Sequence, residues 1–404
     1  MKDTVIKNII FVYDQAYFSG GAANIVIGEA IELAKRRYNV SFFSAIGPVD
    51  ERLVQNGVSV VCLNERHIAK TKNLMALLKG IWNCNAYIKL KEFLNYYNAD
   101  NTVVHVHGWT KALSAAVFKA CHEKGFRTFI TLHEYFSVCQ NGGLFDYKKN
   151  KICDKTPGTV KCYLCNCDKR NYFNKIYRNI RRVVQDNTLK KLKPNVIYIT
   201  EFSRKKICNL PFIPAKEYFL HNFVNVRKHE RVKAEDNKDF LFIGRVSDEK
   251  GIELFCEAVN RTNVSGIVIG DGPLKEKYEL LFENIKFVGW KNQDELRTYI
   301  INARALIIAS KWYETMGLTV IEMQQYGVPC LIPRECAASE YVLHGASGEL
   351  FQIGNLESLI QAINKFKKFD YVKKLSETFY SDLNFEKYSI INHVDSLLKI
   401  YEDA

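Results

Sequence analysis

Short apolar runs alternate with longer segments of helical periodicity along the first half of the chain. The first helical segment is expected at 23–37, where Ile25, Ala30 and Leu33 recur at helical spacing, and a longer helix is expected at 74–97. Strands that alternate with helices in this way are typical of a parallel, doubly wound α/β sheet. The predicted strands of this half are 9–13, 40–45, 58–63, 103–106, 128–132 and 196–200.

The same alternation starts again after a polar and charged stretch at 223–238. We interpret this stretch as a linker, because 404 residues exceed what one compact domain usually holds. It separates an N-terminal domain, 1–222, from a C-terminal domain, 239–385, and an amphipathic helix at 386–404 ends the chain. The predicted strands of the second domain are 240–243, 267–269, 285–288, 305–309 and 330–332.

The composition predicts well-filled cores and no membrane span. Hydrophobic residues make up 47% of the chain, and no apolar run approaches the ~20 residues that a membrane helix needs. The N-terminus has two lysines and then only the short apolar run 9–13, which predicts no signal peptide. We therefore expect a cytoplasmic protein whose twelve cysteines are reduced or metal-bound.

Two glutamates, Glu314 and Glu322, lie eight positions apart in the segment that says most about function. The apolar run 305–309 precedes them, and Gly327 has the place of a residue that ends a helix, so the segment reads as strand, loop and helix. Glu314 would lie in the loop at the carboxyl end of the strand, where open α/β sheets bind ligands. Glu322 would lie on the helix.

The start of this predicted helix offers backbone amides to a phosphate. Free N–H groups and the positive end of the helix dipole attract anions, and Gly317 permits close approach. A diphosphate at this place, flanked by carboxylates that accept hydrogen bonds from hydroxyls, has the layout of a nucleotide diphosphate sugar. The alternative is an ordinary α/β crossover with two solvated glutamates. The amides in question are those of Met316, Gly317 and Leu318.

This segment resembles the Glu-x7-Glu motif of the retaining glycosyltransferases of family 4. The resemblance covers nearly the whole chain in the correct order. It implies the α/β architecture called GT-B, in which two Rossmann-like doubly wound domains face each other across a cleft. It also implies that the first domain holds the acceptor, that the second holds the nucleotide sugar, and that the terminal helix crosses back onto the first domain.

Further candidate contacts follow the strands of the second domain. Arg245 and Lys250 come directly after 240–243, where cations would neutralise a diphosphate and the charge that develops on a departing phosphate. The alternative is plain surface charge. By the resemblance, the site contacts are Gly244 in a Gly-Arg…Lys-Gly frame, Gly270 and Gly272 beside the nucleobase, Glu322 on the ribose, Glu314 on the sugar, and Thr315.

The first domain has its own candidate residues. Gly20 and Gly21 lie where the family has a glycine loop that faces the donor phosphates. His107 and His133 each follow a predicted strand, where a histidine can donate to a substrate hydroxyl or stabilise a developing charge. A packed histidine without function is the alternative. We assign His107 to catalysis and His133 to substrate binding, and we expect His105 to be structural and to point away from His107.

The chain has no Asp-x-Asp sequence, which metal-dependent glycosyltransferases use to hold a divalent cation. We therefore expect no cofactor to be required for catalysis. The family implies front-face attack with retention, in which the leaving phosphate helps to take the proton of the acceptor. Double displacement through an unidentified nucleophile is the alternative. The predicted catalytic residues are His107, Arg245, Lys250 and Glu314, and neither glutamate is assigned as a nucleophile.

Five cysteines fall within 29 residues of an insertion at 139–167. Four thiolates could hold a structural Zn²⁺, and Cys-x2-Cys is a usual half-site. Free thiols in a reducing compartment are the alternative. The insertion resembles those of glycosyltransferases from bacterial surface-polysaccharide loci, although it lacks a cysteine near Thr156 that many of them carry. The candidate ligands are four of Cys139, Cys153, Cys162, Cys165 and Cys167.

A strongly basic segment follows the cysteines. From 161 to 206 there are thirteen Lys and Arg against three acidic residues, in a chain whose net charge is +13. Within it, 172–192 predicts a basic amphipathic helix that could dock on an anionic membrane at the inner face of the cytoplasmic membrane. A core-packed helix with a charged outer face is the alternative. Apolar residues and Arg178, Arg181 and Arg182 are expected side by side on this helix.

Together these patterns favour an enzyme that moves a hexose from a nucleotide diphosphate sugar, with UDP the expected nucleotide. The acceptor would be a lipid-linked or oligosaccharide acceptor of cell-surface polysaccharide such as capsule, O-antigen or lipopolysaccharide. A GT-B epimerase or phosphorylase is the second hypothesis, but no pyridoxal phosphate lysine frame is present. A basic nucleic-acid-binding protein is the third, and no nucleic-acid-binding motif supports it, so we expect no nucleic-acid partner.

Overall fold

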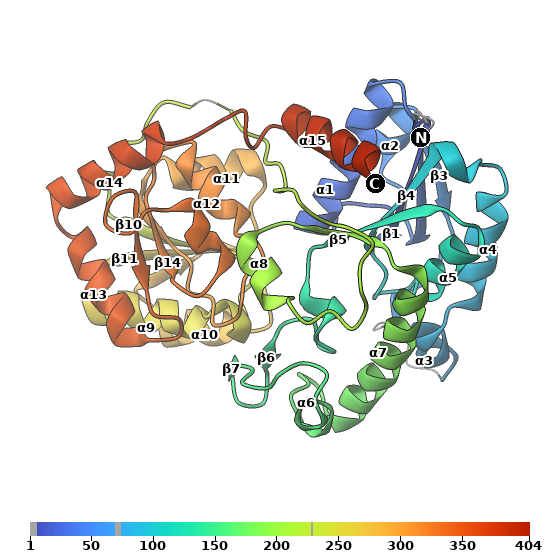
Figure 1. Cartoon of the computed structure of the whole chain (residues 1–404). Helices are drawn as coiled ribbons and strands as arrows, with labels where there is room; N and C mark the ends of the chain where they lie inside the picture. Colours follow the sequence, from blue (N-terminus) through green and yellow to red (C-terminus); the bar gives the residue numbers. More distant parts are fainter. Residues whose placement is uncertain (1–5, 69–73, 228) are drawn as a thin grey trace. The chain divides into compact units, whose positions relative to one another are not determined.

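The computed structural model describes residues 6–68, 74–227 and 229–404. The chain divides into two compact units that are interleaved in sequence. The N-terminal unit comprises Met1–Gly142, Lys155–Phe223 and Lys387–Ala404, and the C-terminal unit comprises Gly143–Asp154 and Val224–Glu386 (Figure 1).

The N-terminal unit is built on a seven-stranded parallel sheet with the strand order β3-β2-β1-β4-β5-β8-β9. Its central strands β1 and β4 are buried along nearly their whole length, which suits a sheet that is covered on both faces. Because the order reverses between β1 and β4, the carboxyl ends of these two strands form a topological switch point. The strands are β1 Asn8–Gln15, β2 Asn39–Ile46, β3 Ser59–Cys62, β4 Thr102–Gly108, β5 Arg127–Leu132, β8 Asn195–Tyr198 and β9 Glu217–Phe219.

The helices of this unit include one that the sequence did not separate. The predicted helix at 74–97 is two helices, because Asn83 leaves the helical conformation and its side chain accepts a hydrogen bond from the Ala86 amide at 3.0 Å. The last helix, α15, packs on α1 through Val394 and Leu397. The helices are α1 Gly21–Lys35, α2 Glu51–Gln55, α3 Leu74–Ile81, α4 Cys84–Leu94, α5 Ala116–Glu123, α6 Val160–Leu164, α7 Tyr172–Leu192, α8 Glu201–Lys206 and α15 Ile390–Asp403.

The C-terminal unit has a six-stranded parallel sheet with the order β12-β11-β10-β13-β14-β15. Its core joins strand residues such as Phe242 and Leu331 to helix residues such as Phe255 and Ile363. The switch point lies between β10 and β13. The strands are β10 Asp239–Ile243, β11 Ser265–Ile269, β12 Ile285–Phe287, β13 Ala303–Ile307, β14 Cys330–Pro333 and β15 Gly348–Phe351, with a separate antiparallel pair, β6 Phe145–Asp146 and β7 Lys151–Ile152.

Helices cover this second sheet, and 3-10 turns join several elements. The helices are α9 Ile252–Thr262, α10 Lys275–Leu281, α11 Gln293–Ile300, α12 Leu318–Gln324, α13 Leu356–Phe366 and α14 Phe369–Ser381. The 3-10 segments of the chain include η2 Ala99–Asn101, η3 Tyr135–Ser137, η4 Ala234–Asp236, η5 Asp248–Lys250 and η6 Ala337–Tyr341.

Two parallel, helix-covered sheets confirm the α/β, doubly wound class that the sequence predicted. Two strands of these parallel sheets were missed: β9, which pairs with β8, and β15, which pairs with β14. The short antiparallel pair β6 and β7 was not predicted either. No helix in the described part of the chain combines the length and the apolar character needed to cross a membrane.

Candidate functional site

In the C-terminal unit, the loops after β10 and β13 bring two predicted site residues together. Lys250 Nζ lies 2.6 Å from Glu314 Oε1, and the hydroxyl of Ser310 donates to the same oxygen at 2.5 Å. Lys250 also lies 5.5 Å from the centre of the Trp312 ring. Burial opposes ionisation of Glu314, but Lys250 and Ser310 hold its pKa below the ordinary value. Glu314 is therefore an ionised carboxylate with an oriented cation.

Arg245 provides a second cation at the same edge of the sheet. It follows β10 directly, it is exposed, and no described residue pairs with it. Lys250 is half-buried at the end of η5. The loop thus offers one cation already engaged by a carboxylate and one that is free to meet an anionic ligand.

We predicted that the amides of Met316, Gly317 and Leu318 begin the helix that carries Glu322, but this helix begins two residues after Met316. Helix α12 starts at Leu318, and Gly317 is its N-cap with φ 86°. A Cβ at Gly317 would lie 2.5 Å from the Cβ of Ala338, so glycine is required both by the backbone and by the packing against η6. Met316 is buried, and Thr315 lies in the loop before it. At the other end, Gly327 has φ 70°, as expected for the residue that ends the helix.

Glu322 has a different environment from Glu314. It is partly buried on α12, no described residue makes a hydrogen bond or ion pair with its carboxylate, and burial raises its pKa. A carboxylate with unused acceptor capacity can receive hydrogen bonds from hydroxyl groups.

Two predicted glycine contacts have a packing role. Gly270 follows β11 with φ 139°, and a Cβ on it would lie 2.0 Å from the carbonyl oxygen of Gly244. A Cβ on Gly272 would lie 2.3 Å from the carbonyl oxygen of Val246. These glycines therefore let the loops after β10 and β11 pack backbone against backbone.

In the N-terminal unit, His107 and His133 lie at the ends of neighbouring strands and contact each other. His107 Nδ1 lies 2.9 Å from His133 Nε2, and His107 Nε2 lies 3.1 Å from Glu29 Oε2. The other oxygen of Glu29 lies 2.8 Å from Nε2 of His393, whose Nδ1 donates to the carbonyl oxygen of His221 at 2.7 Å. One buried carboxylate on α1 thus links the predicted catalytic histidine to α15.

Glu29 and His393 are site residues that the sequence reading missed. Burial opposes the charge of Glu29, but His107 and His393 hold its pKa well below the ordinary value. Burial and the nearby His107 lower the pKa of His133 to about 3, so this ring stays neutral. The sequence signal that could have identified Glu29 is its position on the apolar face of its helix, four residues after Ile25 and four before Leu33.

We expected His105 to point away from His107, and this prediction is wrong. Residues two apart in a strand share a face, and the two ring centroids lie 4.0 Å apart. His105 is structural nonetheless, because its nitrogens lie 2.6 Å from Tyr401 Oη and 2.8 Å from Thr131 Oγ1. Glu29, His105 and His107 bring ligand atoms within 4.8 Å of one another. The hydrogen bonds of both histidines suit a buried network better than a metal ion.

A cavity opens beside the two histidines. It is lined by Tyr13, Asp14, His107, His133 and Glu134 among others. The buried carboxylate of Asp14 accepts hydrogen bonds from the amides of residues 111–113 at 2.8–2.9 Å, which fixes the loop after β4. Ala22, at the start of α1, also lines the cavity. Gly20, with φ 134°, is the N-cap of α1 and Gly21 is its first residue.

The five clustered cysteines do not form a ready-made metal site. Cys153 belongs to the C-terminal unit and the other four to the N-terminal unit. Among the described residues, no three cysteine sulfurs lie within 4.8 Å of one another. Lys175 is buried beside the thiols of Cys167, Cys162 and Cys165, which raise its pKa although burial opposes its charge. Because an ammonium group repels a metal cation, these residues do not fit zinc in the arrangement described. Zinc binding by four of the five cysteines is not tested by this arrangement and stays a prediction.

The basic helix α7 is amphipathic, but its apolar residues and its arginines do not lie side by side on one exposed face as predicted. Phe173, Ile176 and Ile180 are exposed. Arg182 is buried and Arg181 donates to the Thr110 carbonyl oxygen, so these arginines point into the unit and not along the exposed apolar stripe. Less of the basic charge is therefore on the surface than the sequence suggested.

The model of the family "Glycosyl transferases group 1" matches residues 225–380. A 41.2 kDa protein in the cps region of Klebsiella pneumoniae is 24% identical over 287 residues, which are 67% of this chain and 78% of that protein. The lipopolysaccharide 1,2-N-acetylglucosaminetransferase of Salmonella typhimurium is 27% identical over 184 residues, which are 41% of this chain and 48% of that enzyme.

The solved structure of Anabaena HepE in complex with UDP and glucose resembles this chain with a TM-score of 0.68 at 13% identity, over 98% of this chain and all of that one. This likeness shows the fold, which is GT-B. The family match falls on the unit that holds the Lys250–Glu314 pair, Arg245 and Glu322. Residues 225–380 therefore resemble the glycosyl transferases group 1, and the chain as a whole has the GT-B fold.

Proposed function

We propose that this protein is a retaining hexosyltransferase that uses a UDP-sugar and a lipid-linked or oligosaccharide acceptor in the synthesis of a cell-surface polysaccharide. The observation that carries the proposal is the Lys250–Glu314 pair at 2.6 Å, held at the switch point of the unit that the family model matches. The related proteins of a cps region and of lipopolysaccharide synthesis support the choice of acceptor class.

The C-terminal unit would bind the donor. Arg245 is free to pair with the diphosphate, and Lys250 would share its charge between the diphosphate and Glu314. Glu314 accepts from sugar hydroxyls, and Glu322, whose carboxylate has no described partner, accepts from the ribose. A structural relative binds UDP and glucose, which supports UDP as the nucleotide.

The N-terminal unit would bind the acceptor in the cavity beside His107 and His133. His107 is oriented by Glu29 on one nitrogen and His133 on the other, so it presents a fixed ring edge to a substrate hydroxyl. The neutral His133 completes the wall of the cavity.

In the proposed reaction, the bond between the anomeric carbon and the phosphate oxygen breaks as the acceptor hydroxyl bonds to the same face of that carbon. The acceptor proton passes to the departing phosphate oxygen, so the products are UDP and the glycosylated acceptor with retained configuration. Arg245 and Lys250 stabilise the charge that develops on the phosphate. No step requires a metal ion, and metal independence is part of the proposal.

Product analysis tests this function directly. The full chain is incubated with UDP-glucose, UDP-galactose and their N-acetyl forms, with and without extracted polysaccharide precursors, and UDP release is measured. The anomeric configuration of the product is read by proton NMR. Acceptor-dependent UDP release with an α-linked product from an α-linked donor is expected. An inverted product would refute retention, and isomerised donor without transfer would establish an epimerase.

The exposed stripe on α7 would dock this unit on an anionic membrane. Phe173 is 81% exposed, and the neighbouring α3 exposes Leu74 and Met75. The two helices lie side by side, and the Tyr177 hydroxyl donates to the Leu77 carbonyl oxygen at 3.0 Å (Figure 1). Apolar side chains within a basic segment are typical of interfacial binding. Co-sedimentation with vesicles rich in phosphatidylglycerol should weaken in Phe173→Ser and not in Tyr96→Ser, an exposed aromatic on another element.

A further inference from the structure

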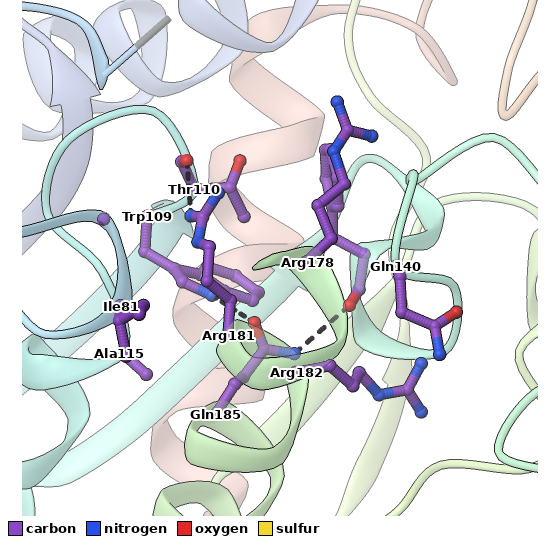
Figure 2. A pocket seen from close by; sticks show the side chains of 11 residues that line it. Ile81, Trp109, Thr110, Ala115, Gln140, Arg178, Arg181, Arg182 and Gln185 are labelled. Carbon is purple, nitrogen blue, oxygen red and sulfur yellow. Dashed lines mark hydrogen bonds between the residues drawn. The ribbon is translucent and has the colours of Figure 1, made fainter. Parts of the chain in front are cut away.

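A second pocket of the N-terminal unit is lined by three arginines of one helix (Figure 2). Arg178, Arg181 and Arg182 of α7 line one side. Trp109 and Thr110, after β4, and Gln140, after β5, line the other. All of these residues belong to the same unit. We call this cavity the arginine pocket.

Two buried hydrogen-bond donors of the arginine pocket lack partners. Arg182 is 5% exposed, and its Nε donates to both oxygens of Asp186, but its Nη1 has no partner among the described residues. Gln140 is 4% exposed, and its side-chain oxygen accepts from Cys162 and Lys175. Its Nε2 also has no hydrogen-bond partner among the described residues. In Figure 2 the Gln140 amide and the Arg182 guanidinium extend to the same side of the pocket. Unpaired buried donors cost free energy, which an acceptor would recover.

Positive charge also exceeds negative charge around the pocket. Arg182 pairs with Asp186, and Arg178 lies 3.1 Å from Asp168. Arg181 forms no ion pair with any described carboxylate, and it donates to the Thr110 carbonyl oxygen at 2.6 Å. Burial lowers the pKa of Arg181, which reflects the cost of holding this charge away from water. Asp14, in the adjoining cavity, attracts the Arg181 charge without an ion pair between them, so the Arg181 guanidinium keeps donors for an anionic ligand.

The arginine pocket adjoins the cavity beside His107. Trp109, Thr110 and Phe136 line both cavities. Gln185 fixes this shared wall, because its oxygen accepts from Trp109 Nε1 at 2.7 Å and its amide donates to the Phe136 carbonyl oxygen at 3.1 Å. A ligand that fills both cavities would carry a neutral part beside His107 and an anionic part beside the arginines.

We propose that the arginine pocket binds a phosphate group of a phosphorylated acceptor, so that the acceptor's sugar reaches the cavity beside His107. The assignment of the sugar to that cavity rests on the proposed function, whereas anion binding by the pocket does not. A diphosphate fits better than a carboxylate, because the Arg181 guanidinium beside Thr110 lies apart from the Arg182 and Gln140 donors, and only an anion with several separated oxygens can reach both places (Figure 2). A phosphate offers at least three oxygens to these donors and a carboxylate two.

Binding of inorganic pyrophosphate tests the pocket without any reaction. The parent for calorimetry is the full chain with Arg245→Ala and Lys250→Ala, which removes the expected donor site. Arg181→Gln and Arg178→Gln are added separately, and Arg52→Gln, on the exposed side of α2, is the matched control. Arg181 is the preferred target, because its removal leaves no buried carboxylate unpaired.

The expected result is at least tenfold weaker pyrophosphate binding in Arg181→Gln and Arg178→Gln, with the parent's affinity in Arg52→Gln and unchanged circular dichroism in all. Equal affinity in every variant, absence of binding in the parent, or equally tight binding of glucuronate would overturn the proposal. If Arg181→Gln does not fold, Arg178→Lys decides alone, because lysine keeps a cation beside the buried Asp168 and removes the guanidinium group.

A kinetic comparison decides whether the bound phosphate belongs to the acceptor. In the chain with an intact donor site, a prenyl-diphosphate-linked sugar and the same unphosphorylated sugar are compared as acceptors. Arg181→Gln should raise KM about tenfold for the diphosphate and leave that for the free sugar unchanged. Equal use of both acceptors would show that the pocket takes free phosphate and would overturn the acceptor assignment. Failure of UDP-sugar turnover altogether would instead refute the proposed function, with pyrophosphate binding still deciding the pocket.

Discussion

Lys250 Nζ lies 2.6 Å from Glu314 Oε1, so an ion pair joins two residues that are 64 positions apart and that lie in the segments after different strands of one sheet, β10 and β13. The Lys250 side chain is 29% exposed and that of Glu314 is 14% exposed, which places the pair between a surface and a buried salt bridge. The sequence analysis predicted both residues to be catalytic, and their direct contact makes each one depend on the other.

A double-mutant cycle measures this dependence. Lys250→Ala leaves a mostly buried carboxylate without its cation, so it should lower the free energy of unfolding of the C-terminal unit by about 1–3 kcal/mol. Adding Glu314→Gln should restore part of that loss, because the uncompensated charge is gone. Urea denaturation followed by tryptophan fluorescence gives the coupling free energy, expected at about 1–2 kcal/mol.

Lys311→Ala is the matched control for this cycle. Lys311 pairs with Glu253 at 2.9 Å in the same unit, but the Glu253 side chain is 47% exposed. The control should therefore cost less than about 1 kcal/mol. A double variant that is less stable than Lys250→Ala alone would contradict the ion-pair account.

Replacing Gly317 by alanine should destabilise the C-terminal unit more than the same change at another left-handed glycine. Gly345 also has positive φ, 72°, but a Cβ there would meet nothing within 4 Å, whereas at Gly317 it would lie 2.5 Å from Ala338. Gly345→Ala should cost about 1 kcal/mol from backbone strain, and Gly317→Ala about 1–3 kcal/mol more from overpacking. Thermal unfolding of both variants checks this difference, and equal losses would show that the start of α12 can shift.

The sequence revealed much of the fold, because β1 and β10 contain the uninterrupted apolar runs 9–13 and 240–243 and helical segments follow them. It did not reveal the break at Asn83, since the apolar periodicity on both sides continues across a capping residue. The C-terminal strand ends could be predicted as ligand sites from topology alone. Confirmation that the predicted residues act there still requires the experiments.

Side-chain direction was the part that the sequence left open. Arg181 and Arg182 have the spacing of surface charges, yet both side chains point into the unit. There Arg181 donates to the carbonyl oxygen of Thr110, and Arg182 donates to the carboxylate of Asp186. The role of Glu29 could not be predicted either. A carboxylate on an apolar helix face gives no local sequence signal for histidine partners that are distant in the chain. Such pairings depend on tertiary contacts that no short sequence window contains.

The buried His133 should make the N-terminal unit sensitive to acid. In the folded chain its pKa is about 3, compared with 6.5 for an unperturbed histidine, because burial and the nearby His107 disfavour the charged ring. Between these values the unfolded chain binds the proton and the folded chain does not, so stability should fall as the pH drops from about 6.5 toward 3. Urea denaturation at several pH values should show this slope.

The histidine at position 133 can be separated from other acid effects by substitution. His133→Asn should flatten the dependence of the unfolding free energy on pH within this window, at some cost in overall stability. His122→Asn, at an exposed position on α5, should leave the dependence as it is. Parallel curves for the wild type and His133→Asn would mean that the ring is protonated in the native protein.

Glu29 should control turnover through His107 without touching the donor. Its two oxygens face Nε2 of His107 at 3.1 Å and Nε2 of His393 at 2.8 Å. Glu29→Gln leaves one acceptor oxygen for two imidazoles, so His107 loses its fixed orientation, and kcat should fall about tenfold to a hundredfold. KM for the UDP-sugar should not change, because the donor is expected in the other unit. Glu29→Asp, which keeps the charge, should restore part of kcat, and the pH profile of kcat should shift in Glu29→Gln only. A loss of stability with unchanged kcat would instead make the Glu29–His393 contact a purely structural tie between α1 and α15.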